Sequence, residues 1–302
     1  MPAALPLPPP PPLTLPLQQS PLYRDALRRI GADAAVMAWA GGDWLVLRRE
    51  FPVIGRVALV SRPDLAADAD PGPLRKDLGA DLVIVNAATA ANGAAFRRAG
   101  FLRLAPPREV AMLSLARQPE DWLARMDGKW RNRLRHAQRQ PLTITAGALA
   151  PDPNHWIFQA EAAQQRARGY RNLPPTLIAA MGATAGALTL FTAQTAGTTI
   201  AAMLFARHAS GASYLIGWSD AQGRNLSAHN LILWHAMNNL ARQGVAAIDL
   251  GQCAGDQADG LARFKRGAGA ATMVLGGTWA MAGLLAPLHG LLRGLRSRMP
   301  PP

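Results

Sequence analysis

The chain has 302 residues, a formal net charge of +13 and a sequence pI of about 11.3. Hydrophobic residues make up 49% of it and charged residues 17%, which excludes an intrinsically disordered protein and allows about two domains. The positive charge favours anionic partners such as a nucleotide, a pyrophosphate, an RNA or an acidic membrane.

The first part of the chain predicts one mixed α/β domain. Residues 1–16 are rich in proline and predict an extended tail without a secretory signal. Strand-length apolar runs then alternate with helical segments, and Gly41 and Gly42 turn a hairpin. We expect helices at 21–30, 74–78 and 90–99 and strands at 34–40, 44–48, 56–60, 82–86 and 110–115.

A basic segment follows at residues 119–140. Trp122, Met126, Trp130 and Leu134 recur at helical spacing, and arginines fill much of the remainder. The pattern predicts one connector helix over 121–140. Two interpretations stay open: a solvated basic helix packed between domains by its tryptophans, or a phosphate-binding helix that projects arginines such as Arg131 and Arg135.

The second part of the chain again predicts a mixture of helices and strands. Turns at 196–197 and 210–211 separate three strands that predict an antiparallel meander. We expect helices at 154–168, 174–181, 226–243 and 259–266, the meander at 188–194, 198–207 and 213–218, and further strands at 142–145, 245–250 and 271–275.

The strand at 245–250 predicts a ligand-binding edge. It carries Asp249 near its carboxyl end and opens into a glycine-containing loop at 251–255, where open α/β sheets place their ligands. Asp249 is a candidate proton acceptor for an attacking amine, or a loop cap through Asx hydrogen bonds. Lys265, on the helix that follows, is a candidate for stabilising an oxyanion, or a helix-end charge.

The last segment is apolar. Residues 268–292 contain no Asp, Glu, Lys or Arg, but Gly276, Gly277 and Pro287 interrupt them. Residues 279–298 fit an amphipathic helix from Trp279 to Arg298. It can span a membrane, lie at its interface or pack on the domain. In the interfacial interpretation, a chain that ends at Gly277 stays folded and loses only vesicle binding.

Four motifs in order resemble the FemAB family of acyl and aminoacyl transferases. They are LQQSP followed by Tyr23 (residues 17–23), RAGF (98–101), KWRNRLR followed by Ala137 (129–137), and DLG with GL and FK (249–265). The resemblance covers about residues 17–277. It implies an α/β (mixed α+β) fold with two tandem GNAT-like domains, at 17–118 and 141–278, each a mixed sheet flanked by helices.

The resemblance also implies an activity. It predicts transfer of an acyl or aminoacyl group from aminoacyl-tRNA or acyl-CoA to a primary amine, in a ternary complex without a covalent enzyme intermediate. A lipid-linked or UDP-linked peptidoglycan precursor is the expected acceptor. The family's Phe-Lys pair, here Phe264 and Lys265, lines the cleft and helps to hold the donor. No tightly bound cofactor is expected.

One departure concerns the loop that binds pyrophosphate in GNAT proteins. The motif Q/R-x-x-G-x-G/A reads here Arg224, Asn225, Leu226, Ser227, Ala228, His229. Arg224 matches, but Ser227 and His229 replace small residues and would crowd a phosphate at a helix N-terminus. This weighs against coenzyme A. A second departure is that no long helical hairpin is inserted in the second domain.

The remaining candidates are less specific. Tyr214 and Trp218 lie four apart on one predicted strand, so we expect them to share a face, where they line a ligand cleft or pack in the core. Gln164 and Tyr170 are candidate acceptor contacts. No metal site is expected, since no His, Cys or carboxylate grouping has ligand spacing. Cys253 is the only cysteine, which excludes an intrachain disulfide and fits a packed core residue.

The sequence therefore predicts a cytoplasmic acyltransferase, with peripheral association at the inner face of a membrane through residues 279–302. Two alternatives remain: a GNAT N-acyltransferase that uses acyl-CoA or an acyl carrier protein on a small amine, and a non-catalytic module that binds tRNA or a membrane.

Overall fold

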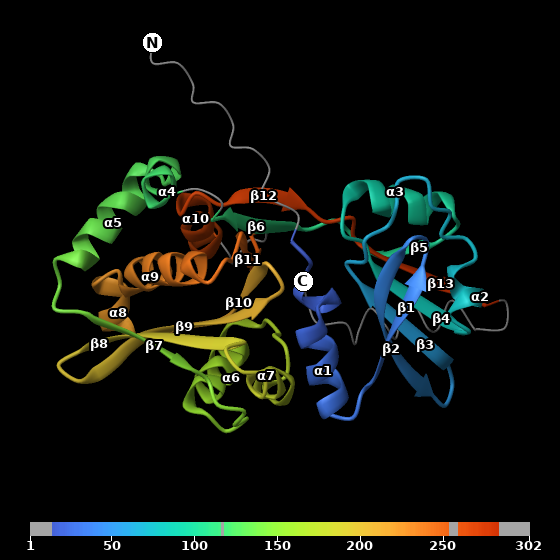
Figure 1. Ribbon diagram of the computed structural model, residues 1–302, viewed down its shortest axis with the longest axis horizontal. Coiled ribbons are helices and arrows are strands. Elements are labelled where there is room, and N and C mark those ends of the chain that lie inside the picture. Colours follow the sequence, from blue (N-terminus) through green and yellow to red (C-terminus); the bar gives the residue numbers. More distant parts are fainter. Residues whose placement is uncertain (1–13, 116–117, 254–258, 284–302) are drawn as a thin grey trace, which may run out of the picture. The chain divides into compact units, whose positions relative to one another are not determined.

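A computed structural model of the chain describes residues 14–115, 118–253 and 259–283 (Figure 1). Contacts divide these residues into two units. Unit 1 contains the segments 110–147 and 190–273, and unit 2 contains 16–109, 148–189 and 274–283. The predicted linear domains at 17–118 and 141–278 differ from this division, because each unit is assembled from separate segments. Most of the predicted proline-rich tail lies outside the described residues.

Unit 1 is built on a seven-stranded mixed sheet with the order β12-β6-β11-β10-β9-β8-β7. Strands β9 and β10 pair antiparallel, whereas β10 and β11 pair parallel. The strands are β6 (Glu109–Ser114), β7 (Thr143–Ala148), β8 (Leu188–Thr195), β9 (Thr198–His208), β10 (Gly211–Ser219), β11 (Ala247–Gln252) and β12 (Ala271–Val274).

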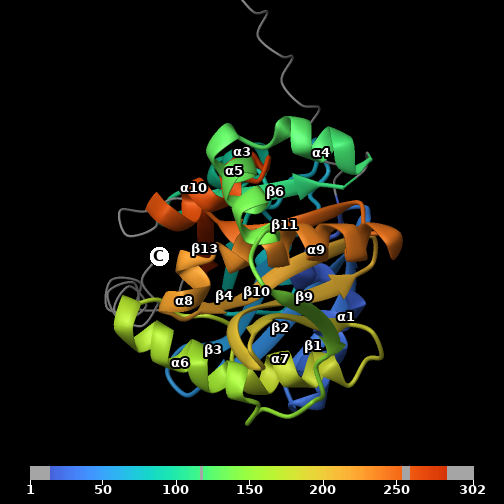
Figure 2. The same cartoon turned by 90° about the vertical axis from the view of Figure 1, so that its left-hand side faces the viewer.

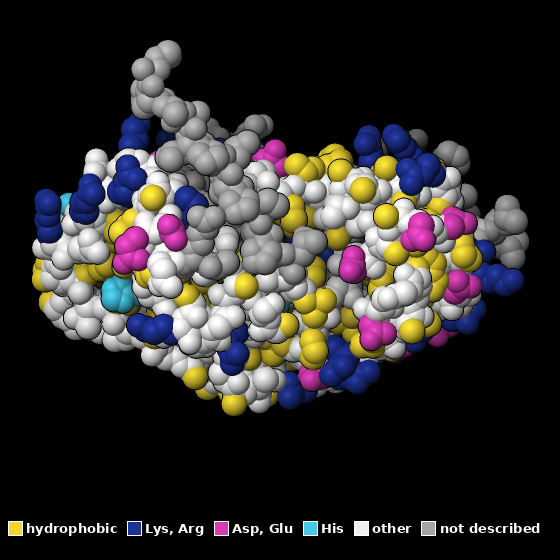
Figure 3. All heavy atoms as spheres, turned by 45° about the horizontal axis from the view of Figure 1, so that its top comes forward, with side chains coloured by type: hydrophobic (Ala, Val, Ile, Leu, Met, Phe, Trp, Pro, Cys, Tyr) yellow, Lys and Arg dark blue, Asp and Glu magenta, His cyan; other side chains and the backbone are white. Residues whose placement is uncertain are grey.

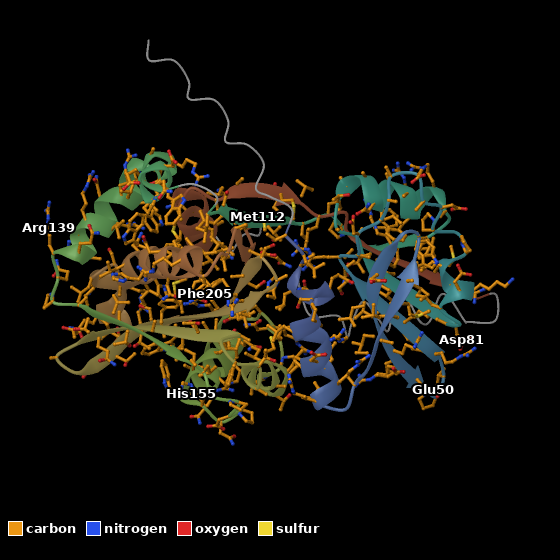
Figure 4. All side chains as sticks on the ribbon, in the orientation of Figure 1. Glu50, Asp81, Met112, Arg139, His155 and Phe205 are labelled. Carbon is orange, nitrogen blue, oxygen red and sulfur yellow. The ribbon has the colours of Figure 1, made fainter. Side chains whose placement is uncertain are left out.

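Helices cover one face of this sheet. They are α4 (Pro119–Arg125), α5 (Gly128–Gln138), α8 (Ala221–Asn225), α9 (Ala228–Arg242) and α10 (Asp259–Gly267). Both ribbon views show α5 beside α9, and α9 along the sheet (Figures 1 and 2). The core between them includes Trp130 and Leu134 of α5, Met237 of α9 and Phe205 of β9, which lies inside the unit (Figure 4).

The basic segment forms two helices, so the prediction of one helix over 121–140 is wrong. Met126 is extended, with φ −66° and ψ 144°, and Asp127 then caps α5 by accepting from the Trp130 N–H. The tryptophan stripe is buried in unit 1, at 2% exposure for Trp122 and 3% for Trp130. This segment is therefore part of the core of unit 1.

Unit 2 contains a six-stranded sheet with the order β1-β2-β3-β4-β13-β5. Its strands are β1 (Asp33–Trp39), β2 (Gly42–Phe51), β3 (Gly55–Ser61), β4 (Leu82–Asn86), β5 (Leu102–Ala105) and β13 (Thr278–Ala282). Its helices are η1 (Leu17–Gln19), α1 (Pro21–Arg29), α2 (Leu74–Asp77), α3 (Ala90–Arg98), α6 (Trp156–Arg168) and α7 (Pro175–Gly182).

Capping residues set several of these helix ends. Ser20 accepts from the Tyr23 N–H at 3.2 Å and Pro21 starts α1, while Thr89 accepts from Asn92 at 3.1 Å at the start of α3. Gly169 adopts φ +68° and ends α6. These residues are polar or conformationally special, so sequence reasoning located the helices within a few residues.

Each sheet incorporates a strand from a distant part of the sequence. β6 lies between β11 and β12, and β13 lies between β4 and β5. Trp279, predicted to start an amphipathic helix, is instead a β13 residue at 6% exposure. The helix prediction over 279–298 is therefore wrong for 279–282, because pairing with β4 makes this segment a buried strand. Residues 284–302 lie outside the described residues.

Two mixed sheets flanked by helices confirm the predicted fold class. Among the described residues, no helix is both long and apolar enough to cross a membrane.

Candidate active site

The parallel strands β10 and β11 separate after three paired positions. Gly211, Ala212 and Ser213 of β10 pair with residues 247–249 of β11. Beyond this point β10 continues to Ser219 and β11 to Gln252, and the two strands no longer pair with each other. A β-bulge interrupts β10 between Tyr214 and Ile216. Such a bulge bends the strand and ends regular pairing. The strands thus diverge at their carboxyl ends, where the sequence predicts a ligand-binding edge.

Lys265 of α10 places its amino group at this divergence. Its Nζ donates to the Gln252 carbonyl at the end of β11 at 2.6 Å, and it lies 5.9 Å from the ring centroid of Tyr214 on β10. The residue is 4% exposed. A lysine ammonium has three N–H donors, and one of them is used by the Gln252 carbonyl in these contacts. The amine can therefore bind a further acceptor.

Burial lowers the pKa of Lys265 to about 8, from an ordinary value of 10.5, while Cys253 and Asp249 act in the opposite direction. The cause is desolvation, which disfavours the ammonium form. Such a buried amine titrates close to neutral pH. Strongly shifted groups in a cleft are typical of functional sites.

Asp249 makes the Asx hydrogen bond that was one of its two predicted roles. Its Oδ1 accepts from the Gly251 N–H at 2.8 Å. Gly251 has φ +77°, and a Cβ there would lie 3.8 Å from Lys265 Nζ. The carboxylate therefore shapes the turn that leads toward Lys265 and lies close enough to act on the pKa of the amine.

Tyr214 and Trp218 do not share a face of the sheet, so the prediction that they do is wrong. Tyr214 pairs with Phe205, whereas Trp218 pairs with Ala202. The bulge adds a residue to β10 and reverses the alternation that follows it. Tyr214 packs on Phe205 at 5.6 Å between ring centroids.

Phe264 and His229 lie together beside this site. The Phe264 ring is 6.4 Å from His229 and 5.9 Å from Trp130, which ties α10 to α5 and α9. His229 Nε2 donates to the Trp218 carbonyl at 2.9 Å, since a carbonyl can only accept. The half-buried Phe264 thus forms part of the core and also an edge of the site.

The segment 220–227 bonds internally. Asp220 accepts from Gly223 N–H at 2.7 Å through its side chain and from Arg224 N–H through its carbonyl, while Leu226 N–H and Ser227 N–H donate to carbonyls of α8. Arg224 donates to the Ser219 carbonyl at 2.8 Å, and Asn225 is exposed. The backbone N–H groups of Gly223, Arg224, Leu226 and Ser227 are therefore used within the segment, while Ser227, the N-cap of α9, makes no side-chain cap hydrogen bond.

Unit 2 has a corresponding parallel pair that stays closed. β3 and β4 pair at five positions, 57–61 with 82–86, without interruption. Asn86 Nδ2 donates to Ser61 Oγ at 2.9 Å, and Thr278 Oγ1 donates to Asn86 Oδ1 at 2.8 Å. A depression of about 430 Å³ at residues 38–43 of unit 2 contains Asp43 as its only ionisable residue. The parallel pair that separates beside a buried amine lies in unit 1.

Arg131 and Arg135 lie on α5 but differ in their contacts. Arg131 is half-buried and donates to the Leu123 carbonyl at 3.1 Å, so it joins α5 to α4. Arg135 is exposed and donates to Asn132 Oδ1 at 3.3 Å. The prediction that both bind a phosphate therefore fits Arg135 better than Arg131.

Gln164 and Tyr170 belong to unit 2, where they surround a carboxylate that sequence reasoning missed. Glu161 is 4% exposed and accepts from Tyr170 Oη at 2.9 Å, Asn172 Nδ2 at 2.8 Å and Gln164 Nε2 at 3.4 Å. It holds the loop after α6 against the helix. The only sequence signal for this cluster was that three polar residues, Gln164, Tyr170 and Asn172, follow Glu161 within eleven residues.

We expect Glu161→Gln to destabilise the protein by about 1–3 kcal/mol, because the amide nitrogen would replace one carboxylate oxygen and face the donors that now bond to that oxygen. Urea unfolding measures it, with the exposed Arg166→Gln on the same helix as a control. A shift within about 0.5 kcal/mol, as at an ordinary surface site, would show that Glu161 does not organise this loop.

Among the described residues, no three His, Cys, Asp or Glu side chains gather in a way that could hold a metal ion.

Comparison with known proteins assigns a family to the part of the chain that holds this site. A family model described as an acetyltransferase (GNAT) domain matches residues 124–266. Residues 124–266 form a GNAT acyltransferase domain. This range contains α5, α9, the diverging strands and Lys265, so the protein is an acyltransferase. No curated protein sequence matches the chain.

Solved structures share the fold over nearly the whole chain. FemX matches with a TM-score of 0.72 and 13% identity, over 93% of this chain and 95% of FemX. L-PGS from Bacillus licheniformis matches with a TM-score of 0.56 and 12% identity, over 94% of this chain and 98% of L-PGS. A tandem GNAT protein from the clavulanic acid biosynthesis pathway matches with a TM-score of 0.50 and 11% identity, over 86% of this chain and 87% of that protein. The architecture is therefore FemAB-like, with tandem GNAT-like folds.

Proposed function

We propose that this acyltransferase moves an acyl or aminoacyl group from an activated carrier to a primary amine, at the divergence of β10 and β11. The observation that carries the proposal is the buried Lys265 amine, which lies between the Gln252 carbonyl and the Tyr214 ring at the open ends of these strands. A cation there is placed to stabilise charge that develops on a carbonyl oxygen.

The proposed reaction is a direct attack in a ternary complex. The neutral acceptor amine forms a C–N bond to the donor carbonyl carbon, and the Lys265 ammonium donates to the oxyanion. The bond to the carrier oxygen or sulfur then breaks, and the proton lost by the amine ends on the leaving group. Asp249 is the proposed first acceptor of that proton.

GNAT domains use acyl-CoA as a co-substrate, but the segment 220–227 fits a pyrophosphate poorly. Its N–H groups at Gly223, Arg224, Leu226 and Ser227 bond within the segment, and the Asp220 carboxylate occupies the N-terminus of α8. At the N-terminus of α9, where the GNAT motif places the pyrophosphate, Ser227 and His229 stand in place of small residues, and the His229 ring is held by the Trp218 carbonyl. This supports aminoacyl-tRNA as the donor over acyl-CoA.

The acceptor proposed from the FemAB resemblance is the amine of a lipid-linked or UDP-linked cell-wall precursor. Phe264, Tyr214 and His229 are proposed to line the donor pocket. Peripheral attachment to an anionic membrane through residues 284–302 also stays a proposal. It is tested by vesicle binding of the full chain and of a chain that ends at Gly283.

The donor is tested by transfer of radiolabelled acyl groups to UDP-linked muropeptide. We expect turnover with aminoacyl-tRNA and at least tenfold less with acetyl-CoA. Turnover with acetyl-CoA alone would favour the small-amine N-acyltransferase. No turnover with either, together with thermal stabilisation by tRNA, would favour the non-catalytic binding module.

A further inference from the structure

Helix α5 presents a basic face to solvent. Its buried stripe contains Trp130, Leu134 and Ala137, and the opposite side exposes four cations. These are Lys129, Arg133, Arg135 and Arg139, which we call the α5 basic face. No acidic residue occurs between Gly128 and Gln140. Figure 3 shows Lys and Arg side chains gathered along this edge of unit 1, and Arg139 points away from the fold (Figure 4).

The charge of this face is not neutralised by the protein. Among the described residues, ion pairs join Arg24 to Asp25 and Arg56 to Asp81, both in unit 2, and none involves α5. The nearest acid in sequence, Asp127, caps the helix through the Trp130 N–H. Like charges held on one rigid helix cost free energy unless an anion neutralises them.

Helix α5 packs through its inner side against α10, the helix that carries Lys265. Trp130 on the inner side of α5 contacts Phe264 at 5.9 Å, and Phe264 precedes Lys265 on α10. The α10 helix also exposes Arg263 and Arg266. The exposed cations of α5 and α10 therefore belong to two helices that pack on each other.

We propose that the α5 basic face, extended by Arg263 and Arg266, is a docking surface for the phosphodiester backbone of the RNA that carries the donor ester. The inference rests on the proposed function, whose donor is an aminoacyl ester. From residue 129 to residue 139 the helix extends about 15 Å, which is enough to contact several successive phosphates. A single pyrophosphate cannot neutralise cations over that distance.

The composition of the face favours RNA over a lipid surface. Between the exposed cations lie Asn132 and Gln138, which are polar, and no exposed large apolar residue lies on α5. Helices that bind bilayer interfaces need an apolar face to insert, and the apolar stripe of α5 is already buried. Arginines also suit bidentate phosphate contacts.

The test is the binding of deacylated tRNA to the full chain, measured by fluorescence anisotropy over a range of salt concentrations. We expect the triple variant Arg133→Gln, Arg135→Gln, Arg139→Gln to raise Kd at least tenfold in moderate salt. The slope of log Kd against log salt concentration should also fall by about two to three, since each lost phosphate contact lowers this slope by about 0.7–0.9.

A matched control removes the same charge elsewhere. Arg97, Arg98 and Arg103 are exposed in unit 2, and their triple Gln variant should leave Kd within about twofold. Equal weakening by both triples would show that binding follows net charge, and the docking surface would be rejected. Unchanged tRNA binding by the α5 variant, with lost binding to anionic vesicles, would assign the face to lipid instead.

The outcome separates this inference from the proposed function. Lys265→Ala should bind tRNA as the native chain does and fail in transfer. An α5 variant that binds tRNA normally would remove the docking surface and leave the transfer proposal intact. A Lys265→Ala variant with native turnover would remove the transfer proposal, whatever binds α5.

Discussion

Replacing Lys265 with alanine is expected to lower kcat at least tenfold while the protein stays folded. The loss corresponds to about 1.4 kcal/mol of transition-state stabilisation. The reason is that the buried Nζ is held by the Gln252 carbonyl at the carboxyl end of β11. Single-turnover transfer with saturating donor measures it.

The pH dependence tests the same group independently. Because burial lowers the pKa of Lys265 to about 8, the ammonium form is lost above that pH, and kcat should fall on the alkaline side. Lys265→Arg should move this fall to higher pH if the variant retains activity, since a guanidinium keeps its proton.

The same shift predicts a stability change. The unfolded chain holds the Lys265 proton up to about pH 10.5, whereas the folded chain releases it near pH 8. Between these values the unfolded state binds more protons, so stability should rise with pH. The contribution should disappear in Lys265→Ala. A native pH profile in that variant, with native kcat, would reduce Lys265 to a structural charge.

Ending the chain at Gly277 is expected to unfold unit 2, contrary to what the sequence alone indicates. The truncation removes β13, which pairs with β4 at five positions, 278–282 with 82–86, and with β5 on its other side. It also removes Trp279, a core side chain whose Nε1 donates to Gly276 at 2.8 Å. Losing such a side chain alone costs about 3–5 kcal/mol.

Circular dichroism and urea unfolding of purified protein measure this effect. A chain that ends at Gly283 is the control, because it keeps β13 and should unfold as the full chain does. Trp279→Ala separates the side chain from the strand and should lower the free energy of unfolding by several kcal/mol. A Gly277 truncation with native stability would show that β13 is dispensable for the sheet.

Local sequence signals predicted most helices and strands. The meander β8–β10 and the hairpin β1–β2 consist of apolar runs of strand length separated by turns that contain glycine, so their signal is contained within a few residues. β5 (Leu102–Ala105) was missed because four residues carry little periodicity. β13 was missed because its pairing partner β4 lies almost two hundred residues away, and the apolar run around it resembles a helix.

The sequence named the candidate residues of the site but not their geometry. Lys265 and Asp249 followed from the strand and from the family motif. The proximity of Lys265 to Tyr214 depends on where α10 returns to the sheet, and no local pattern encodes it. Trp218 was placed on the wrong face because a one-residue bulge leaves no trace in the alternation. The burial of Glu161 depends on the loop after α6.

The most direct test is the NMR spectrum of the full chain labelled at lysine side chains. The sequence contains three lysines, Lys76, Lys129 and Lys265, so each signal can be assigned by a single variant. The predicted result is a Lys265 signal that titrates near pH 8 and shifts on addition of 3′-aminoacylamino-3′-deoxyadenosine, a non-hydrolysable donor end, while Lys76 does not respond. A Lys265 signal that titrates near 10.5, or that stays unchanged at saturating analogue, would contradict acyl transfer at the divergence of β10 and β11.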